Sequence, residues 1–222
     1  MQKVITIDGP SASGKSSVSR ELARKLNWQW VSTGAFYRGL GLVALKSQVD
    51  TQSEAGLLPL IQSPRWKVEL TLPSTLVFFD GEDVTAEIHG EAAGAIASQI
   101  SQFPGVRQGL LQRQRQLAED HDGLIAEGRD CGSVVFPQAF MKFYLTANAD
   151  RRALRRSADD AGSVAETLEM QKKRDFTDSH RKTAPLVAPE GSIVVDSTDL
   201  ELSSVVELVE GKVREKLGSF SF

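Results

Sequence analysis

The residues from Gly9 to Ser16 have the types and the spacing of a phosphate-binding loop. They fit the pattern G-x-x-x-x-G-K-[ST]. Glycines at both ends let the backbone turn, so that successive N–H groups face one anion. The Lys15 amine can then reach the β- and γ-phosphates of a triphosphate, and the Ser16 hydroxyl can ligate Mg²⁺. We expect ATP to be held by Gly9, Pro10, Ser11, Ala12, Ser13, Gly14, Lys15, Ser16 and Ser17.

The sequence on either side of this loop favours a functional site over a fortuitous turn. Val4–Ile7 is a run of β-branched residues that predicts a buried strand, and Lys15–Leu26 has apolar residues at helical spacing. A loop between a strand and a helix places the anion at the helix N-terminus, where the dipole favours negative charge. The loop alone leaves the reaction open, because GTPases, ATPases and small-molecule kinases share it.

Arginines occur where a kinase for a phosphorylated acceptor would need cations. Arg38 lies in the first turns of a predicted helix. Arg129 follows a predicted strand, at the sheet edge where open α/β folds bind ligands. Spacing places two further groups each on one helix face, namely Arg152 with Arg155 and Arg156, and Arg174 with Asp178 and Arg181. Any one of these could be a solvated surface charge, but the placement of Arg38 and Arg129 favours binding.

Glu127 ends the predicted strand that precedes Arg129. An acid at this position in P-loop folds can hold Mg²⁺, usually through water. It could equally pair with Lys15 or with an N–H group of the loop, and the sequence leaves both interpretations open. Magnesium bound with ATP is the cofactor that these residues predict.

Strands and helices alternate over much of the remaining chain. Further strands are predicted at Trp28–Val31, Leu124–Ala126, Lys142–Leu145 and Ile193–Val195. Further helices are predicted after a Ser32/Thr33 cap, from Pro104 to Glu119, and at about Ala149–Ser157 and Leu202–Leu217. This alternation predicts an α/β fold with a parallel sheet covered on both faces.

The pattern changes between about Gln48 and Gln102. Trp66–Thr71 and Leu76–Phe79 have the composition of strands joined by a turn, and Glu91–Ile100 is a small-residue helix. We interpret this stretch as an antiparallel insertion. At the other end of the chain, Ser219–Phe222 is expected to be frayed.

Composition limits the classes of function. The 222 residues include 26 Lys and Arg against 29 Asp and Glu, a net charge of −3, so the surface as a whole is not built for nucleic acid. No apolar run is long enough to cross a membrane, and the strand at Val4 leaves no room for a signal peptide. A single cysteine, Cys131, excludes an internal disulfide. Together these features predict a cytoplasmic protein without a membrane or nucleic-acid partner.

Several segments resemble bacterial cytidylate kinases, in order and across essentially the whole chain. They are ITIDGPSASGKSS, STGAFYRG, ASQISQFPGVR, LIAEGRDCGSVVFP, RRALRR, KKRDFTDSHRKTAPL and VVDST. The resemblance implies a monomeric kinase that transfers the ATP γ-phosphate to CMP or dCMP. It implies a three-layer αβα P-loop domain over 1–222 with a five-stranded parallel sheet. The core would be about 1–61, 103–154 and 183–222, the acceptor-binding insertion 62–102 and the helical lid 155–182.

The resemblance also implies roles for individual residues. The acceptor phosphate would contact Thr33, Arg38, Arg129 and Arg181. Cytosine would be recognised by Ser98, Arg107 and Asp130, and the sugar by Arg174 and Asp178. The ATP side would be lined by Arg152, Arg155 and Arg156. Catalysis would use Lys15, Arg129, Arg155 and Arg181.

Physical chemistry supports part of this transfer, and the sequence departs from the family pattern in places. A carboxylate such as Asp130 suits the N4 amino donor of cytosine and would oppose uracil, which has an acceptor there. The family commonly has serine where Thr33 stands and aspartate where Glu127 stands, and the longer acid leaves the magnesium role open. Cys131 replaces an apolar residue, and we expect it to be a small buried filler.

The sequence leaves three alternatives to a cytidylate kinase. Another P-loop kinase, for uridylate or shikimate, is closest in chemistry. A GTPase switch would usually carry an N-K-x-D segment, which the sequence lacks. An RNA binder would interleave aromatic residues with its cations, whereas these arginines are mixed with acids.

Overall fold

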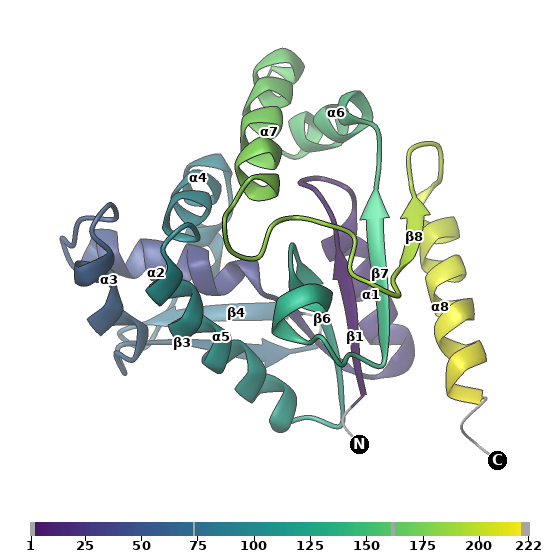
Figure 1. Cartoon of the computed structure of the whole chain (residues 1–222), viewed down its shortest axis with the longest axis horizontal. Coiled ribbons are helices and arrows are strands. Elements are labelled where there is room, and N and C mark those ends of the chain that lie inside the picture. The colour runs from purple at the N-terminus through teal and green to yellow at the C-terminus, as the bar shows by residue number, and fades with distance from the viewer. Residues whose placement is uncertain (1–2, 73, 161–162, 219–222) are drawn as a thin grey trace.

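The computed structural model describes residues 3–72, 74–160 and 163–218, so the predicted tail Ser219–Phe222 lies outside them. Figure 1 shows its helices and strands. The elements are β1 Lys3–Asp8, α1 Lys15–Leu26, β2 Gln29–Ser32, α2 Gly34–Lys46, α3 Glu54–Ile61, β3 Trp66–Thr71, β4 Ser74–Phe79, β5 Glu82–Asp83, the 3₁₀ helix η1 Thr85–Ile88, α4 Glu91–Ile100, α5 Pro104–Glu119, β6 Gly123–Gly128, the π-helical turn η2 Cys131–Val135, β7 Met141–Thr146, α6 Ala149–Asp160, α7 Val164–Ser179, β8 Ile193–Asp196 and α8 Leu202–Gly218.

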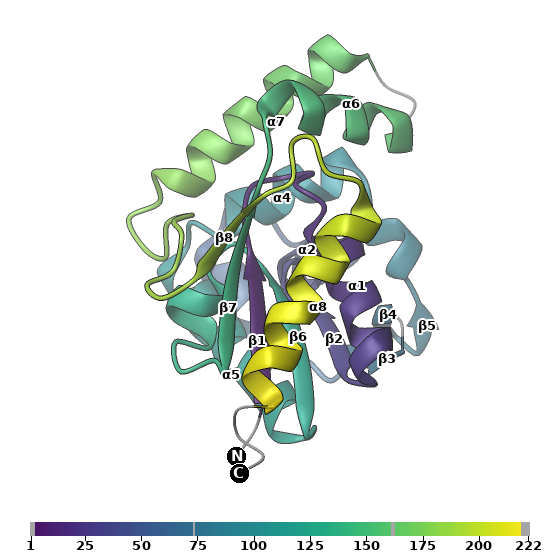
Figure 2. The same cartoon turned by 90° about the vertical axis from the view of Figure 1, so that its right-hand side faces the viewer.

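Five parallel strands form the central sheet, in the order β2-β6-β1-β7-β8. Strand β1 lies in the middle because it is buried on both faces, with Ile5 and Ile7 in the cluster on one face and Val4 in the cluster on the other. The helices α1 and α8 cover one face of this sheet, where Val18 and Val209 pack in the same cluster as Ile5 (Figure 2). The predicted three-layer arrangement with a five-stranded parallel sheet is confirmed.

The opposite face carries a second cluster, which joins the central sheet to the insertion. Phe36 and Leu40 of α2 and Leu110 of α5 pack there with Trp66 of β3. Strands β3, β4 and β5 form a separate antiparallel sheet, as the two predicted strands indicated. This sheet contacts the edge strand β2, and the Thr75 hydroxyl accepts a hydrogen bond from Ser32 N at 3.0 Å.

The helices α6 and α7 form a pair above the carboxyl ends of the parallel strands (Figure 1). Helix α7 packs against α6 and also against α4 of the insertion. The carboxyl ends of the strands therefore have the insertion on one side and this helical pair on the other.

The sequence interpretation was wrong or incomplete at several elements. It missed α3, where Pro59 lies inside the helix, and it missed the short elements β5, η1 and η2. Helix α7 ends at Ser179, so Arg181 lies beyond the helix and does not share a helical face with Arg174 and Asp178. Thr33 is the N-cap residue of α2, but its hydroxyl makes no capping bond; it donates instead to the Glu127 carbonyl at 2.9 Å.

Candidate functional site

One cavity of about 910 Å³ opens at the carboxyl ends of the parallel strands. It extends from the loop after β1, past the residues that follow β6, to the helical pair and the insertion. Of the residues predicted from sequence, Gly9, Pro10, Arg107 and Arg152 do not line it, and all the others do. The fold thus brings the two halves of the predicted site into one space.

The phosphate loop has the backbone geometry that its glycines predict. Gly14 has a φ of 89°, in the region that favours glycine, and directly precedes α1. Gly9 approaches β7 so closely that a Cβ atom there would lie 2.0 Å from the Leu145 carbonyl oxygen. The loop between them surrounds the N-terminus of α1, where N–H groups and the helix dipole favour an anion.

Lys15 is buried at the centre of this loop. Its Nζ donates to the Pro10 carbonyl at 2.5 Å and to Ser13 Oγ at 3.4 Å. Burial, and to a smaller extent the charge of Arg129, lower the pKa of Lys15 to about 7, while Glu127 acts in the opposite direction. A phosphate group at the loop would supply the counter-charge that the amine lacks.

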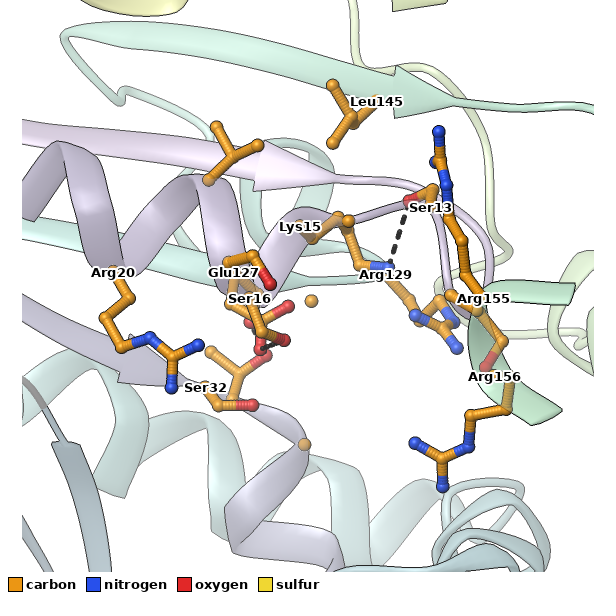
Figure 3. Close-up of a pocket in the computed structure, with 18 of the residues that line it drawn as sticks. Ser13, Lys15, Ser16, Arg20, Ser32, Glu127, Arg129, Leu145, Arg155 and Arg156 are labelled. Carbon is orange, nitrogen blue, oxygen red and sulfur yellow. Dashed lines mark hydrogen bonds between the residues drawn. The ribbon is translucent and has the colours of Figure 1, made fainter. Parts of the chain in front are cut away.

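Ser16 and Glu127 meet on one wall of the cavity. Ser16 Oγ donates to Glu127 Oε1 at 3.0 Å, so the carboxylate is directed at the hydroxyl. Figure 3 shows these two side chains together, with Arg20 on one side and Arg129, Arg155 and Arg156 on the other. Two oxygen donors fit Mg²⁺, which proteins bind through one or two such ligands plus substrate phosphates. Within the described residues, no group of three or more His, Cys, Asp or Glu forms a metal site.

Arg129 connects the phosphate loop to helix α7. Its Nη1 donates to the Gly9 carbonyl at 3.0 Å and its Nε to Asp178 Oδ2 at 2.8 Å. Burial raises the pKa of Asp178, but Arg129 and Arg181 outweigh this and hold the pKa below its usual value. Asp178 is therefore a carboxylate with acceptor capacity left over, and Ser98 Oγ lies 3.5 Å from its other oxygen.

A buried ion pair joins Arg107 of α5 to Asp130, directly after Arg129. The next two backbone N–H groups, of Cys131 and Gly132, donate to the Asp8 carboxylate at 2.8 and 2.7 Å. Asp8 immediately precedes the phosphate loop, so one carboxylate fixes the turn that presents Asp130. Burial raises the pKa of Cys131 well above its usual value, and the thiol remains a protonated filler as predicted.

The three arginines of α6 have different partners. Arg155 donates to the Ser197 carbonyl at 2.7 Å, and Arg156 lines the cavity. Arg152 is buried, and its Nη1 donates to the Ser11 carbonyl at 2.9 Å and to Asp175 Oδ2 at 2.6 Å. The spacing predicted that these three arginines share one helix face. In the structure Arg152 is buried, whereas Arg155 and Arg156 line the cavity.

Several residues around the cavity escaped the sequence analysis. Asp175 directly follows Arg174, and Asp8 directly precedes Gly9. Both are neighbours of candidate residues in the sequence, and this could have drawn attention to them. His89 lines the cavity, where burial and the charges of Arg38 and Arg156 lower its pKa. For Arg20 and Ser197, which also line it, the sequence offers no distinguishing signal.

Comparison with known proteins agrees with this geometry. Residues 5–215 match the family described as cytidylate kinase. A cytidylate kinase of Bdellovibrio bacteriovorus is 51% identical over 98% of this chain and 100% of its own length. The chain belongs to the cytidylate kinase family. Another member, from Aeromonas salmonicida, is 41% identical over 100% of this chain and 98% of its own.

More distant structures share the fold of this cytidylate kinase family member. A gluconokinase of Sinorhizobium meliloti has a TM-score of 0.51 at 12% identity, over 100% of this chain and 98% of that one. A shikimate kinase of Bacteroides thetaiotaomicron has a TM-score of 0.50 at 13% identity, over 96% and 98%. In the described ranges, no helix is both long and apolar enough to cross a membrane.

Proposed function

We propose that this protein transfers the γ-phosphate of ATP to CMP or dCMP, giving ADP and the nucleoside diphosphate. The observation that carries the proposal is one cavity in a member of the cytidylate kinase family, lined both by the phosphate loop and by Asp130, which forms a buried ion pair with Arg107 behind the cavity wall. We further propose that it acts as a monomer in the cytoplasm.

On the donor side, the amides of the loop and Lys15 would hold the ATP phosphates. Arg155 and Arg156 would approach from α6 and neutralise charge on the transferred group, with Arg152 holding the loop in place. Mg²⁺ would be held by Ser16 and, through water, by Glu127, and when bound it supplies positive charge between the phosphates. Positioning and charge account for most of the catalysis in phosphoryl transfer.

On the acceptor side, cations would hold the CMP phosphate in line with ATP. Its phosphate contacts would be Thr33, Arg38, Arg129 and Arg181. Asp130 would accept a hydrogen bond from the cytosine amino group, with Arg107 and Ser98 at the other edge of the base. Arg174 and Asp178 would contact the sugar. No general base is needed, because the attacking phosphate oxygen is already an anion near neutral pH.

The decisive experiment is a coupled assay in which ATP and Mg²⁺ are offered with CMP, dCMP, UMP, AMP or shikimate. We expect turnover with CMP and dCMP. The Lys15→Met variant removes the amine at the phosphates and should lose about 100-fold or more in kcat. Asp130→Ala should reduce the preference for CMP over UMP by about tenfold or more, since one base contact of this kind contributes roughly 1–3 kcal/mol.

Three outcomes would contradict parts of the proposal. Normal activity of Lys15→Met would show that the loop is not the donor site. An unchanged ratio of CMP to UMP turnover in Asp130→Ala would remove that residue from base recognition. Turnover of shikimate or AMP alone by the unmodified protein would assign a different acceptor to the same fold.

A further inference from the structure

Lid helix α7 is attached to the backbone of the phosphate loop by Asp175. The Asp175 Oδ1 atom accepts a hydrogen bond from Ser11 N at 3.2 Å, and its Oδ2 atom accepts from Arg152 Nη1 at 2.6 Å. The same Arg152 nitrogen donates to the Ser11 carbonyl at 2.9 Å. One ion pair between α6 and α7 therefore holds both the N–H and the carbonyl of a single loop residue.

A second attachment lies one turn further along α7. There Asp178 accepts from Arg129 Nε at 2.8 Å, and Arg129 donates to the Gly9 carbonyl at 3.0 Å. Gly9 and Ser11 flank Pro10, so the helix is fixed to the loop on both sides of the proline. Two carboxylates three residues apart on a helix face the same way, which makes this arrangement possible.

The two attachments differ in their relation to the cavity. Arg129 and Asp178 line it, and both would contact the acceptor nucleotide. Arg152 and Asp175 do not line it, and their side chains are only 10% and 17% exposed. The first attachment is therefore out of reach of the acceptor.

We propose that Asp175 is a positioning residue for ATP: with Arg152 it holds the phosphate loop in its binding conformation, and it does so independently of the acceptor. The inference rests on the proposed donor role of this loop. The Arg152–Asp175 pair attaches α7 to the loop outside the cavity, whereas the Arg129–Asp178 pair does so within the cavity wall.

The surroundings of the pair make it rigid. Arg152 Nε donates to the Ala147 carbonyl at 3.0 Å, and the Gln171 side chain donates to the Arg152 carbonyl at 3.3 Å. Charge-assisted bonds in such a partly dry site are stronger than neutral ones. Removing the carboxylate would leave a buried guanidinium without its counter-charge.

The variant Asp175→Asn tests this role. It keeps the size of the side chain and an acceptor for Ser11 N, but it removes the charge. Glu169→Gln is the matched control, because that carboxylate lies on the same helix, is 73% exposed and pairs with Lys172 at 2.9 Å. Dissociation constants are measured by calorimetry for Mg·ATP without acceptor and for CMP without ATP, alongside the thermal midpoint.

We expect Asp175→Asn to raise the dissociation constant for Mg·ATP about tenfold and to leave that for CMP within about twofold. Glu169→Gln should change neither. The double variant Arg152→Gln/Asp175→Asn should bind ATP at least as tightly as whichever of the two single variants has the lower ATP affinity, because the two side chains act as one unit. Asp175→Glu, which keeps the charge, should recover part of the affinity even if Asp175→Asn folds poorly.

Unchanged ATP affinity in Asp175→Asn would overturn the inference. An equal loss of affinity for ATP and CMP would also overturn it, because it would indicate a general loosening of the lid. Absence of CMP phosphorylation by the unmodified protein would refute the proposed acceptor, yet the ATP titration would still test Asp175. The two failures are therefore distinguishable.

Discussion

At the scale of single residues, Lys15 is an ammonium group whose environment disfavours its charge. Burial lowers its pKa to about 7, with a further contribution from Arg129. At pH 8 most of the free protein therefore carries a neutral Lys15. Phosphate groups placed against the amine would favour the charged form again.

Binding of Mg·ATP at pH 8 should accordingly take up protons, approaching one per site. Calorimetric titrations in two buffers of different ionisation enthalpy measure this number directly. At pH 6 the Lys15 amine is already protonated before Mg·ATP binds, so the proton uptake on binding should largely disappear. Heats that are the same in both buffers at pH 8 would contradict the expected change in the Lys15 charge.

At the residue scale, the sequence pointed to candidate residues where a motif and its position coincided. The loop from Gly9 to Ser16 and Arg129 were found because each follows a recognisable strand, whereas Asp130 was found through the family resemblance. Lys15, Arg129 and Asp130 line the cavity, and their roles stay predictions. Asp8 and Asp175 were missed because their importance comes from backbone N–H groups that approach from distant parts of the chain. No spacing in the sequence indicates that the Asp8 carboxylate receives the N–H groups of Cys131 and Gly132.

At the scale of elements, Thr75 joins the antiparallel sheet to the edge of the parallel one. Its hydroxyl accepts from Ser32 N at 3.0 Å and donates to the Trp30 carbonyl at 3.2 Å, and the residue is buried. Strand β2 lies at the edge of the parallel sheet, and the Thr75 hydroxyl thus makes hydrogen bonds to its backbone that a further strand would otherwise make. Ser32 directly precedes Thr33 in the cavity wall, so the contact also fixes the start of α2.

Thr75→Val keeps the shape of the side chain and removes both hydrogen bonds. We expect the free energy of unfolding to fall by about 1–3 kcal/mol, because two backbone groups lose their partner. Urea unfolding followed by circular dichroism measures this change. Thr71→Val, at an exposed threonine of β3, is the control and should change stability by less than about 0.5 kcal/mol. Equal effects of the two substitutions would argue against a joining role for Thr75.

Elements were predictable where periodicity was strong and tertiary context weak. The helices α1, α5 and α8 and the strands β1 and β7 match the expectation within a few residues. Helix α3 was missed because Pro59 and its short length obscure the pattern. The turn η2 was missed because its conformation depends on Asp8, which is 123 residues away along the chain.

At the scale of the whole molecule, Asp8 couples stability to pH. Burial raises its pKa from 3.8 to about 6, despite the hydrogen bonds from Gly132 and Cys131. Between these two values the folded state binds more protons than the unfolded state, so stability decreases as the pH rises. The contribution is complete below pH 3.8 and is lost as the pH passes 6.

We compare the free energy of unfolding of the unmodified protein with that of Asp8→Asn, and this difference should fall by about 2.5 kcal/mol between pH 4 and pH 7. Above pH 7 the difference should be constant. Denaturant melts of both proteins at each pH provide the measurement, and taking the difference cancels groups that the two proteins share. A difference that rises with pH would show that the Asp8 pKa is lowered in the folded state.

The order of the parallel strands has a consequence for enzyme engineering. The proposed donor loop follows the central strand β1, whereas Asp130, the proposed contact to the base, follows its neighbour β6, and the insertion stands beyond that, at the edge strand β2. The proposed contacts to the base therefore lie on one flank of the sheet, and the proposed contacts to the sugar come from α7. Grafting that flank from a kinase with another acceptor should change which molecule receives the phosphate. The phosphate loop, with β1 and α1, would remain that of this protein.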